Sequence, residues 1–165
     1  MDRLRPLPLV LGMLAWLAIC FLAAGAGAAA SIQARSFYSQ LTQPAWAPPG
    51  WIFGPVWTLL YLLMALAAWL VWKDKGFRGA ALALGLFLLQ LAANGLWTWL
   101  FFAWRKGALA SAEILLLDGL VLATILAFRR HRPLAAALLL PYLAWIAFAT
   151  ALCFTLWRAN PALLG

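Results

Sequence analysis

Charge is scarce in this chain of 165 residues, of which 10% are charged and only four are acidic. By contrast, 67% are hydrophobic, and the mean hydropathy is +0.95. A soluble domain of this size cannot hide so much apolar surface, because a small globule leaves much of its chain exposed. The composition therefore excludes an ordinary soluble domain and indicates a protein for which the bilayer acts as solvent.

Residues that carry common catalytic chemistry are also few. The one histidine, His131, lies among arginines, and the chain has no Cys-x-x-Cys pair, no glycine-rich phosphate loop and no metal-ligand histidine spacing. Cys20 and Cys153 both fall inside apolar runs, which predicts buried thiols and no disulfide framework. We expect no metal site and no required cofactor. A haem iron would lack the usual histidine ligand, which leaves Cys153 as the intramembrane candidate.

The basic residues do not form a single patch. The net charge is +8, but the 12 Lys and Arg residues lie singly or in short groups between apolar runs, so we expect no nucleic-acid partner. Eight of them fall on the N-terminal side of five alternating spans and four on the other side. The positive-inside rule then predicts a cytoplasmic N-terminus.

What the sequence has in abundance is long apolar runs, each able to supply the roughly 20 residues that a membrane-spanning helix needs. They predict an all-α fold, a single integral membrane domain built as a five-transmembrane-helix bundle. The predicted spans are 7–30, 51–72, 79–104, 108–128 and 134–156, with a basic turn over 73–78 and a long loop over 31–50. The first run also resembles a signal peptide, but it is longer than the usual apolar region, which favours a retained helix.

The densest pattern lies where the long loop meets the second span. Residues 44–51 read Pro-Ala-Trp-Ala-Pro-Pro-Gly-Trp, a rigid turn in which proline fixes φ and removes backbone donors. Phe53, Trp57 and Tyr61 follow at positions i, i+4 and i+8 on one helix face. These rings fit either an aromatic belt at the membrane interface or the wall of a pocket for a flat apolar ligand, with the loop folded over its mouth.

The third span carries polar residues on one face. Gln90, Asn94, Trp97, Thr98 and Phe101 follow helical spacing. Polar side chains at membrane depth must find partners, so we expect this face to point into the bundle. The same span opens with Gly79 and Ala83, and with Ala81 and Gly85, at a spacing of small residues that permits contact with another helix or a second copy.

The last two spans add two acidic residues, Glu113 and Asp118, and one aromatic face. Asp118 lies near the middle of its span, where a charged side chain costs at least ~2.5–3.5 kcal/mol. It is interpreted either as a functional residue or as part of a hydrogen bond that bridges two helices. In the fifth span Pro141 can bend the helix, while Trp145, Ala149 and Leu152 share its face. Ala149 leaves a gap beneath Trp145 where a ligand ring fits.

Three blocks of residues resemble the signature of the translocator protein family, whose bacterial members are also called tryptophan-rich sensory proteins. The blocks are residues 44–61, 94–102 and 141–150, within a match that runs from about Leu7 to Arg158. The resemblance implies a five-helix membrane fold, commonly homodimeric, with a ligand cavity beneath the first loop. Family ligands include protoporphyrin IX, haem, sterols and synthetic benzodiazepine-type compounds.

The resemblance also implies which residues bind the ligand. The candidates are Tyr38, Trp46, Trp57, Tyr61, Asn94, Trp97, Thr98, Asp118, Trp145, Ala149 and Leu152. Some family members promote light-dependent porphyrin breakdown through two tryptophans, which match Trp57 and Trp145. The family's sterol pattern has tyrosine where this chain has Phe154. Such patterns are weak, and the departure argues against strong cholesterol binding.

The predicted function is that of a receptor-like protein in a bacterial membrane. It would bind porphyrin, haem or a related flat hydrophobic ligand in tetrapyrrole or stress regulation, with membrane lipid and a second copy as partners. Alternatives are a light-dependent porphyrin-degrading enzyme, in which Trp57 and Trp145 donate electrons, and a transporter of porphyrin- or sterol-like molecules. A purely structural membrane protein is disfavoured by the costly Asp118 and by the aromatic loop.

Overall fold

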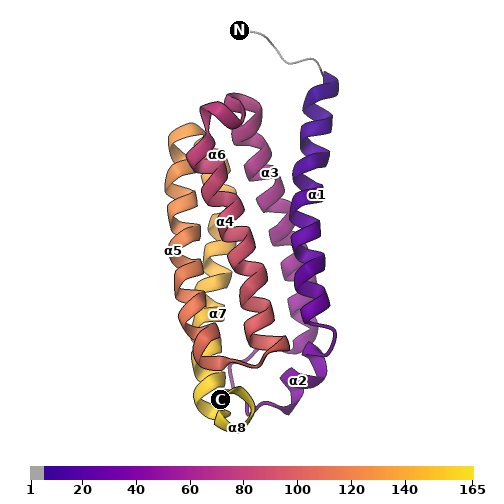
Figure 1. The fold of residues 1–165 in the computed structure, drawn as a ribbon, viewed down its shortest axis with the longest axis vertical. Coiled ribbons are helices and arrows are strands. Elements are labelled where there is room, and N and C mark those ends of the chain that lie inside the picture. The colour runs from indigo at the N-terminus through magenta and orange to yellow at the C-terminus, as the bar shows by residue number, and fades with distance from the viewer. Residues whose placement is uncertain (1–5) are drawn as a thin grey trace.

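The computed structural model of the protein describes residues 6–165. It contains five helical segments long and apolar enough to cross a membrane, which confirms the predicted all-α, five-span fold. These segments are Leu7–Ala30, Gly50–Gly79, Ala81–Ala103, Gly107–His131 and Pro133–Ala159. They run side by side along the long axis of the molecule (Figure 1).

The spans are built from long helices with short elements at their ends. The long helices are α1 (Pro6–Ala30), α3 (Phe53–Gly79), α4 (Ala81–Thr98), α5 (Gly107–His131) and α7 (Leu140–Ala159). The short elements are α2 (Ala34–Gln40), the 3-10 turn η1 (Gly50–Ile52), the π-helical turn η2 (Trp99–Ala103), α6 (Pro133–Leu138) and α8 (Pro161–Leu164). The elements α2 and α8 lie at the same end of the bundle, opposite the start of α1 (Figure 1).

Two segments differ from the sequence prediction at their ends. The predicted turn over 73–78 is mostly a continuation of α3, in which Gly76 alone leaves the helical conformation, with φ 65° and ψ −179°. The interruption falls there because glycine adopts positive φ without a steric penalty. The fifth span is divided at Leu139, between α6 and α7. The division lies beside Pro141, which has no N–H to donate to the preceding turn.

The end of α4 contains a π-helical turn that the sequence pattern does not reveal. The Trp104 N–H donates to the carbonyl of Trp99 at 2.8 Å, a bond that spans five residues. The wider turn holds an extra residue and rotates the side chains after it relative to those of a regular helix. As a result Phe101, expected on the face of Asn94, packs against the Phe37 ring, with ring centres 6.4 Å apart.

Close packing between α1 and α3 depends on a glycine. A Cβ added to Gly12 would lie 2.1 Å from Cζ3 of Trp72, so the indole ring lies directly over this glycine. Beside it, the Trp69 Nε1–H donates to the backbone carbonyl of Leu9 at 3.0 Å. Small residues of this kind let two membrane helices bring their backbones together.

The prediction that the polar face of the third span points inward is confirmed. Gln90 and Asn94 are each 1% exposed. The Tyr142 hydroxyl donates to Gln90 Oε1 at 2.8 Å, and Asn94 Nδ2 donates to the Tyr61 hydroxyl oxygen at 3.1 Å. These bonds join α4 to α7 and to α3, and they supply the partners that polar groups require where lipid replaces water.

Candidate functional site

A cavity of about 580 Å³ lies within the bundle at the end that α2 covers. Its wall combines residues of α1, α2, α3, α4, η2 and α7. This volume falls within the roughly 300–1,000 Å³ typical of small-molecule sites. The cavity is therefore large enough for an organic ligand and is shaped by segments far apart in the sequence.

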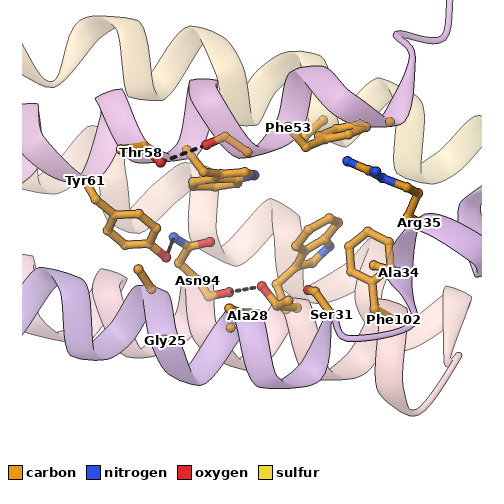
Figure 2. Close-up of a pocket in the computed structure, with 18 of the residues that line it drawn as sticks. Gly25, Ala28, Ser31, Ala34, Arg35, Phe53, Thr58, Tyr61, Asn94 and Phe102 are labelled. Carbon is orange, nitrogen blue, oxygen red and sulfur yellow. Dashed lines mark hydrogen bonds between the residues drawn. The ribbon is translucent and has the colours of Figure 1, made fainter.

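One wall of the cavity is the aromatic face that periodicity predicts for α3. Phe53, Trp57 and Tyr61 all line it. The Phe53 ring centre lies 5.9 Å from that of Trp145 on α7, and the rings of Trp57 and Tyr61 are 5.7 Å apart. Figure 2 shows Phe53 and Thr58 on one side of the open space and Gly25, Ala28 and Ser31 on the other. The rings thus form a continuous apolar surface opposite a helix of small residues.

The loop after α1 forms a roof over this cavity. The buried Tyr38 hydroxyl donates to the carbonyl of Pro48 at 3.0 Å, and its ring packs edge-on against Phe53 at 5.4 Å. Burial raises the pKa of Tyr38, so the hydroxyl remains a donor at neutral pH. Farther along, the Thr42 N–H donates to Asn160 Oδ1 at 2.7 Å, and Asn160 Nδ2 donates to the Thr42 carbonyl at 3.0 Å. The roof is therefore closed on itself by one hydrogen bond and joined to Asn160, after α7, by two more.

Two indole groups in the wall have hydrogen-bonding capacity that the protein does not use. Trp97 Nε1 and Trp145 Nε1 are buried and have no partner within residues 6–165, and both side chains line the cavity. A buried indole N–H usually finds a partner, because an unsatisfied donor costs free energy. Each nitrogen is itself shielded from the open space, so these rings contribute apolar surface to the wall rather than accessible donors.

The structure brings most of the predicted ligand-binding residues into one wall. Those that line the cavity are Tyr38, Trp57, Tyr61, Asn94, Trp97, Thr98, Trp145 and Ala149. They come from four separate elements, and periodicity places each group on the correct face of its own helix. Their role in binding stays a prediction that the geometry supports.

The other three predicted residues do not line the cavity. Trp46 is 49% exposed, and its ring packs against Phe148 at 5.8 Å, because the proline-rich turn carries it past the roof. Leu152 lies almost a turn beyond Ala149 and is buried in a cluster with Cys153. Asp118 accepts a hydrogen bond from Thr150 Oγ1 at 2.8 Å, which joins α5 to α7. Its position therefore corresponds to the helix-bridging alternative.

Several lining residues were not among the sequence candidates. They are Phe21, Ala24, Gly25, Gly27, Ala28, Ser31, Ala34, Arg35, Gly50, Gly54, Thr58 and Phe102. The signal for α1 is its Ala/Gly-rich end, where small side chains let another helix approach. A Cβ added to Gly27, for example, would lie 3.6 Å from Thr98 Oγ1. The signal for Phe102 is its spacing, since it follows Asn94 and Thr98 at i+8 and i+4.

No group of three or more His, Cys, Asp or Glu that could hold a metal ion occurs in the part of the chain that the structure describes. The Cys153 thiol lies 3.6 Å from the Ser111 hydroxyl, inside a buried cluster, and does not line the cavity. A haem in the cavity would therefore be held by packing and hydrogen bonds, because this thiol does not reach the wall.

Five apolar spans and a roofed cavity define an integral, multi-pass α-helical membrane protein of a receptor- or transporter-like class. Within this class the chain belongs to the TspO/MBR family, which it matches over residues 14–158. It is 44% identical to the human translocator protein over 126 residues, which are 75% of each chain.

Microbial relatives match over more of the chain. The chain is 40% identical to the tryptophan-rich protein TspO of Archaeoglobus fulgidus over 154 residues, 93% of this chain and 97% of the relative. It is 39% identical to a tryptophan-rich sensory protein of Cereibacter sphaeroides over 147 residues, 89% of this chain and 90% of the relative. These comparisons confirm the resemblance drawn from the three sequence blocks.

Proposed function

We propose that the protein binds a flat hydrophobic ligand of the porphyrin or haem type in this cavity and acts as a receptor in tetrapyrrole or stress regulation. The observation that carries the proposal is the cavity of about 580 Å³ with aromatic rings from α3, α4 and α7 along its wall. A flat conjugated ligand stacks on such rings, and each aromatic pair contributes ~0.5–1.5 kcal/mol beyond the buried area.

The wall also carries a few polar side chains. Thr58, Asn94 and Thr98 line the cavity among the aromatic rings. A few placed polar groups in a largely apolar wall are typical of cofactor and small-molecule sites, where they fix the orientation of the ligand.

Substitution of Trp145 tests the proposal directly. In purified protein, we expect Trp145→Ala to weaken protoporphyrin IX binding at least tenfold, or ~1.4 kcal/mol, because the fifth-helix ring is lost from the wall. The measurement is a titration of protein fluorescence quenching, checked by the shift of porphyrin absorbance. Trp104→Ala is the matched control, since Trp104 is 54% exposed and lies outside the cavity. Equal affinity in wild type and Trp145→Ala would remove α7 from the site.

Light-dependent porphyrin breakdown is a second candidate, favoured by the presence of Trp57 and Trp145 in the same wall. One electron would pass from an indole ring to the photoexcited porphyrin, which leaves an indole radical cation and a porphyrin radical anion. Illumination of the bound complex distinguishes this reaction from binding alone. A Trp57→Phe variant that still binds porphyrin but forms no product would assign the chemistry to Trp57.

Transport through the bundle is less well supported by the packing. Beyond the cavity floor, Met64 is fully buried beside Gln90, and the Tyr142–Gln90 and Tyr61–Asn94 hydrogen bonds join the helices across the interior. A porphyrin-sized molecule could pass only if these contacts separated. The geometry therefore favours a site open at one end.

A further inference from the structure

Among residues 6–165, the cavity wall carries a single side chain of the Lys, Arg, Asp, Glu or His type, and it is Arg35 of α2. The rest of the wall is apolar apart from hydroxyl, amide and indole groups. An arginine remains charged at all ordinary pH values. Any ligand in the cavity therefore meets one fixed positive charge at the roof, with no acidic residue in the wall to neutralise it.

The position of Arg35 directs this charge toward the ligand space. A Cβ added to Gly50 would lie 4.0 Å from Arg35 Cγ and 3.7 Å from Tyr38 Cδ1, so the arginine stem passes next to the start of the second span. Figure 2 shows the guanidinium extending from α2 into the space beside Phe53. The residue as a whole is exposed, which places its charge at the mouth of the cavity.

Arg132 and Arg105 have partners within the protein, whereas Arg35 does not. The Arg132 guanidinium pairs with Asp74 at 2.6 Å, and that of Arg105 lies 4.6 Å from the centre of the Phe37 ring. Within residues 6–165 the Arg35 guanidinium has neither an ion pair nor a hydrogen bond. A planar guanidinium with free donors matches the geometry of a carboxylate, which it binds through two parallel hydrogen bonds.

We propose that Arg35 determines ligand specificity by pairing with a carboxylate on the edge of the bound molecule. The cavity then selects amphipathic anions, with a flat apolar body against the rings and an acidic edge at the mouth, over neutral molecules of the same shape. This inference rests on the proposed function, because it assigns a ligand class to the same cavity.

The test compares two ligands that differ only in charge. Protoporphyrin IX carries two carboxylates, and its dimethyl ester carries none. In neutral detergent at low salt, we expect wild type to bind the diacid roughly five- to tenfold more tightly than the diester, as a partly solvated charged hydrogen bond allows. In Arg35→Gln we expect this ratio to fall to about one, because only the diacid loses affinity.

Two further variants separate charge from structure. Arg35→Lys keeps the positive charge and should retain part of the preference for the diacid. Arg158→Gln is the matched control, since Arg158 is exposed at the end of α7 and lies outside the cavity wall. The preference of wild type should also weaken as salt is added, whereas the affinity for the diester should not change.

Three results would overturn the inference. Arg35→Gln could keep the wild-type ratio of the two affinities. It could also lower the affinity for both ligands equally, and this second result would mean a structural role for the side chain. Alternatively, phosphatidylglycerol, but not the zwitterionic phosphatidylcholine, could abolish the preference in wild type, which would assign Arg35 to an anionic lipid headgroup. If wild type bound neither ligand, the proposed function would fail first, and the two failures are thereby distinguished.

Discussion

Among single residues, Gly12 and Trp72 illustrate how side-chain volume controls the approach of membrane helices. The indole ring of Trp72 occupies the volume that any side chain at position 12 would need. Gly119 on α5 is the opposite case, because nothing lies within 4 Å of a Cβ added there. The same residue type is thus required at one position and replaceable at the other.

Stability should reflect this contrast. We expect Gly12→Ala to destabilise the protein by ~1–3 kcal/mol, because the new methyl group overpacks the contact between α1 and α3. Gly119→Ala should leave stability unchanged or slightly higher, since alanine is the better helix former. The measurement is thermal unfolding of both variants in the same detergent. A lower midpoint for Gly119→Ala alone would contradict the packing described for Gly12.

At the scale of elements, the roof is held to the bundle by residues far from it in the sequence. Asn160, 6% exposed at the end of α7, hydrogen-bonds both backbone groups of Thr42. At the end of α4, Arg105 adopts φ 54° and places its guanidinium over the Phe37 ring of α2. The roof therefore depends on two separate attachments to the long helices.

Removal of one attachment should loosen the roof without unfolding the spans. In Asn160→Ala we expect hydrogen exchange over residues 41–50 to rise roughly tenfold, or ~1.4 kcal/mol, because the Thr42 backbone loses both partners. Ser39→Ala is the control, since its hydroxyl bonds only within α2, to the Ser36 carbonyl at 2.8 Å. Unchanged exchange in Asn160→Ala would show that the Thr42 contact does not hold the roof.

For the whole molecule, the two ends of the bundle differ in charge. The turns that join α3 to α4 and α5 to α6 lie at one end, connected by the Arg132–Asp74 ion pair. The basic residues at this end are Lys73, Lys75, Arg78, Arg129, Arg130 and Arg132. The end with the roof has Arg35, Arg105, Lys106 and Arg158. The positive-inside rule therefore predicts that the roof and the cavity mouth face away from the cytoplasm.

Cysteine labelling tests this orientation. Cys20 and Cys153 are buried, at 0% and 2% exposure, so they should not react with a membrane-impermeant maleimide. We expect Ser39→Cys, on the exposed side of α2, to be labelled in right-side-out vesicles. Lys75→Cys, exposed at the other end, should be labelled only after permeabilisation. The reverse pattern would invert the topology.

Dimer formation stays a prediction. The structure limits which of the two small-residue pairs of the third span could form the contact. Ala83 is 1% exposed and packs within the bundle, so the Gly79–Ala83 pair does not offer a free face. Ala81 and Gly85 are exposed on the outside of α4, with nothing within 4 Å of a Cβ added to Gly85. Of the two small-residue pairs, only the second can contact another copy.

Three properties could be predicted from the sequence alone: that lipid surrounds the protein, that it has five spans, and which helix faces point into the bundle. Apolar runs of about 20 residues have one stable form in lipid, and helical periodicity then places Trp57, Asn94 and Trp145 on the faces that line the cavity. These properties are local, because each depends on residues within a few turns of one another.

Which of the inward residues share the cavity depends on the three-dimensional packing of the helices. Asp118 and Leu152 have the same kind of position in the sequence as Trp145, yet Asp118 bonds to Thr150 and Leu152 is buried in a separate cluster, both away from the cavity. Arg35 enters the wall through the position of α2. Such placement depends on how helices rotate and approach in three dimensions, and no single segment encodes that.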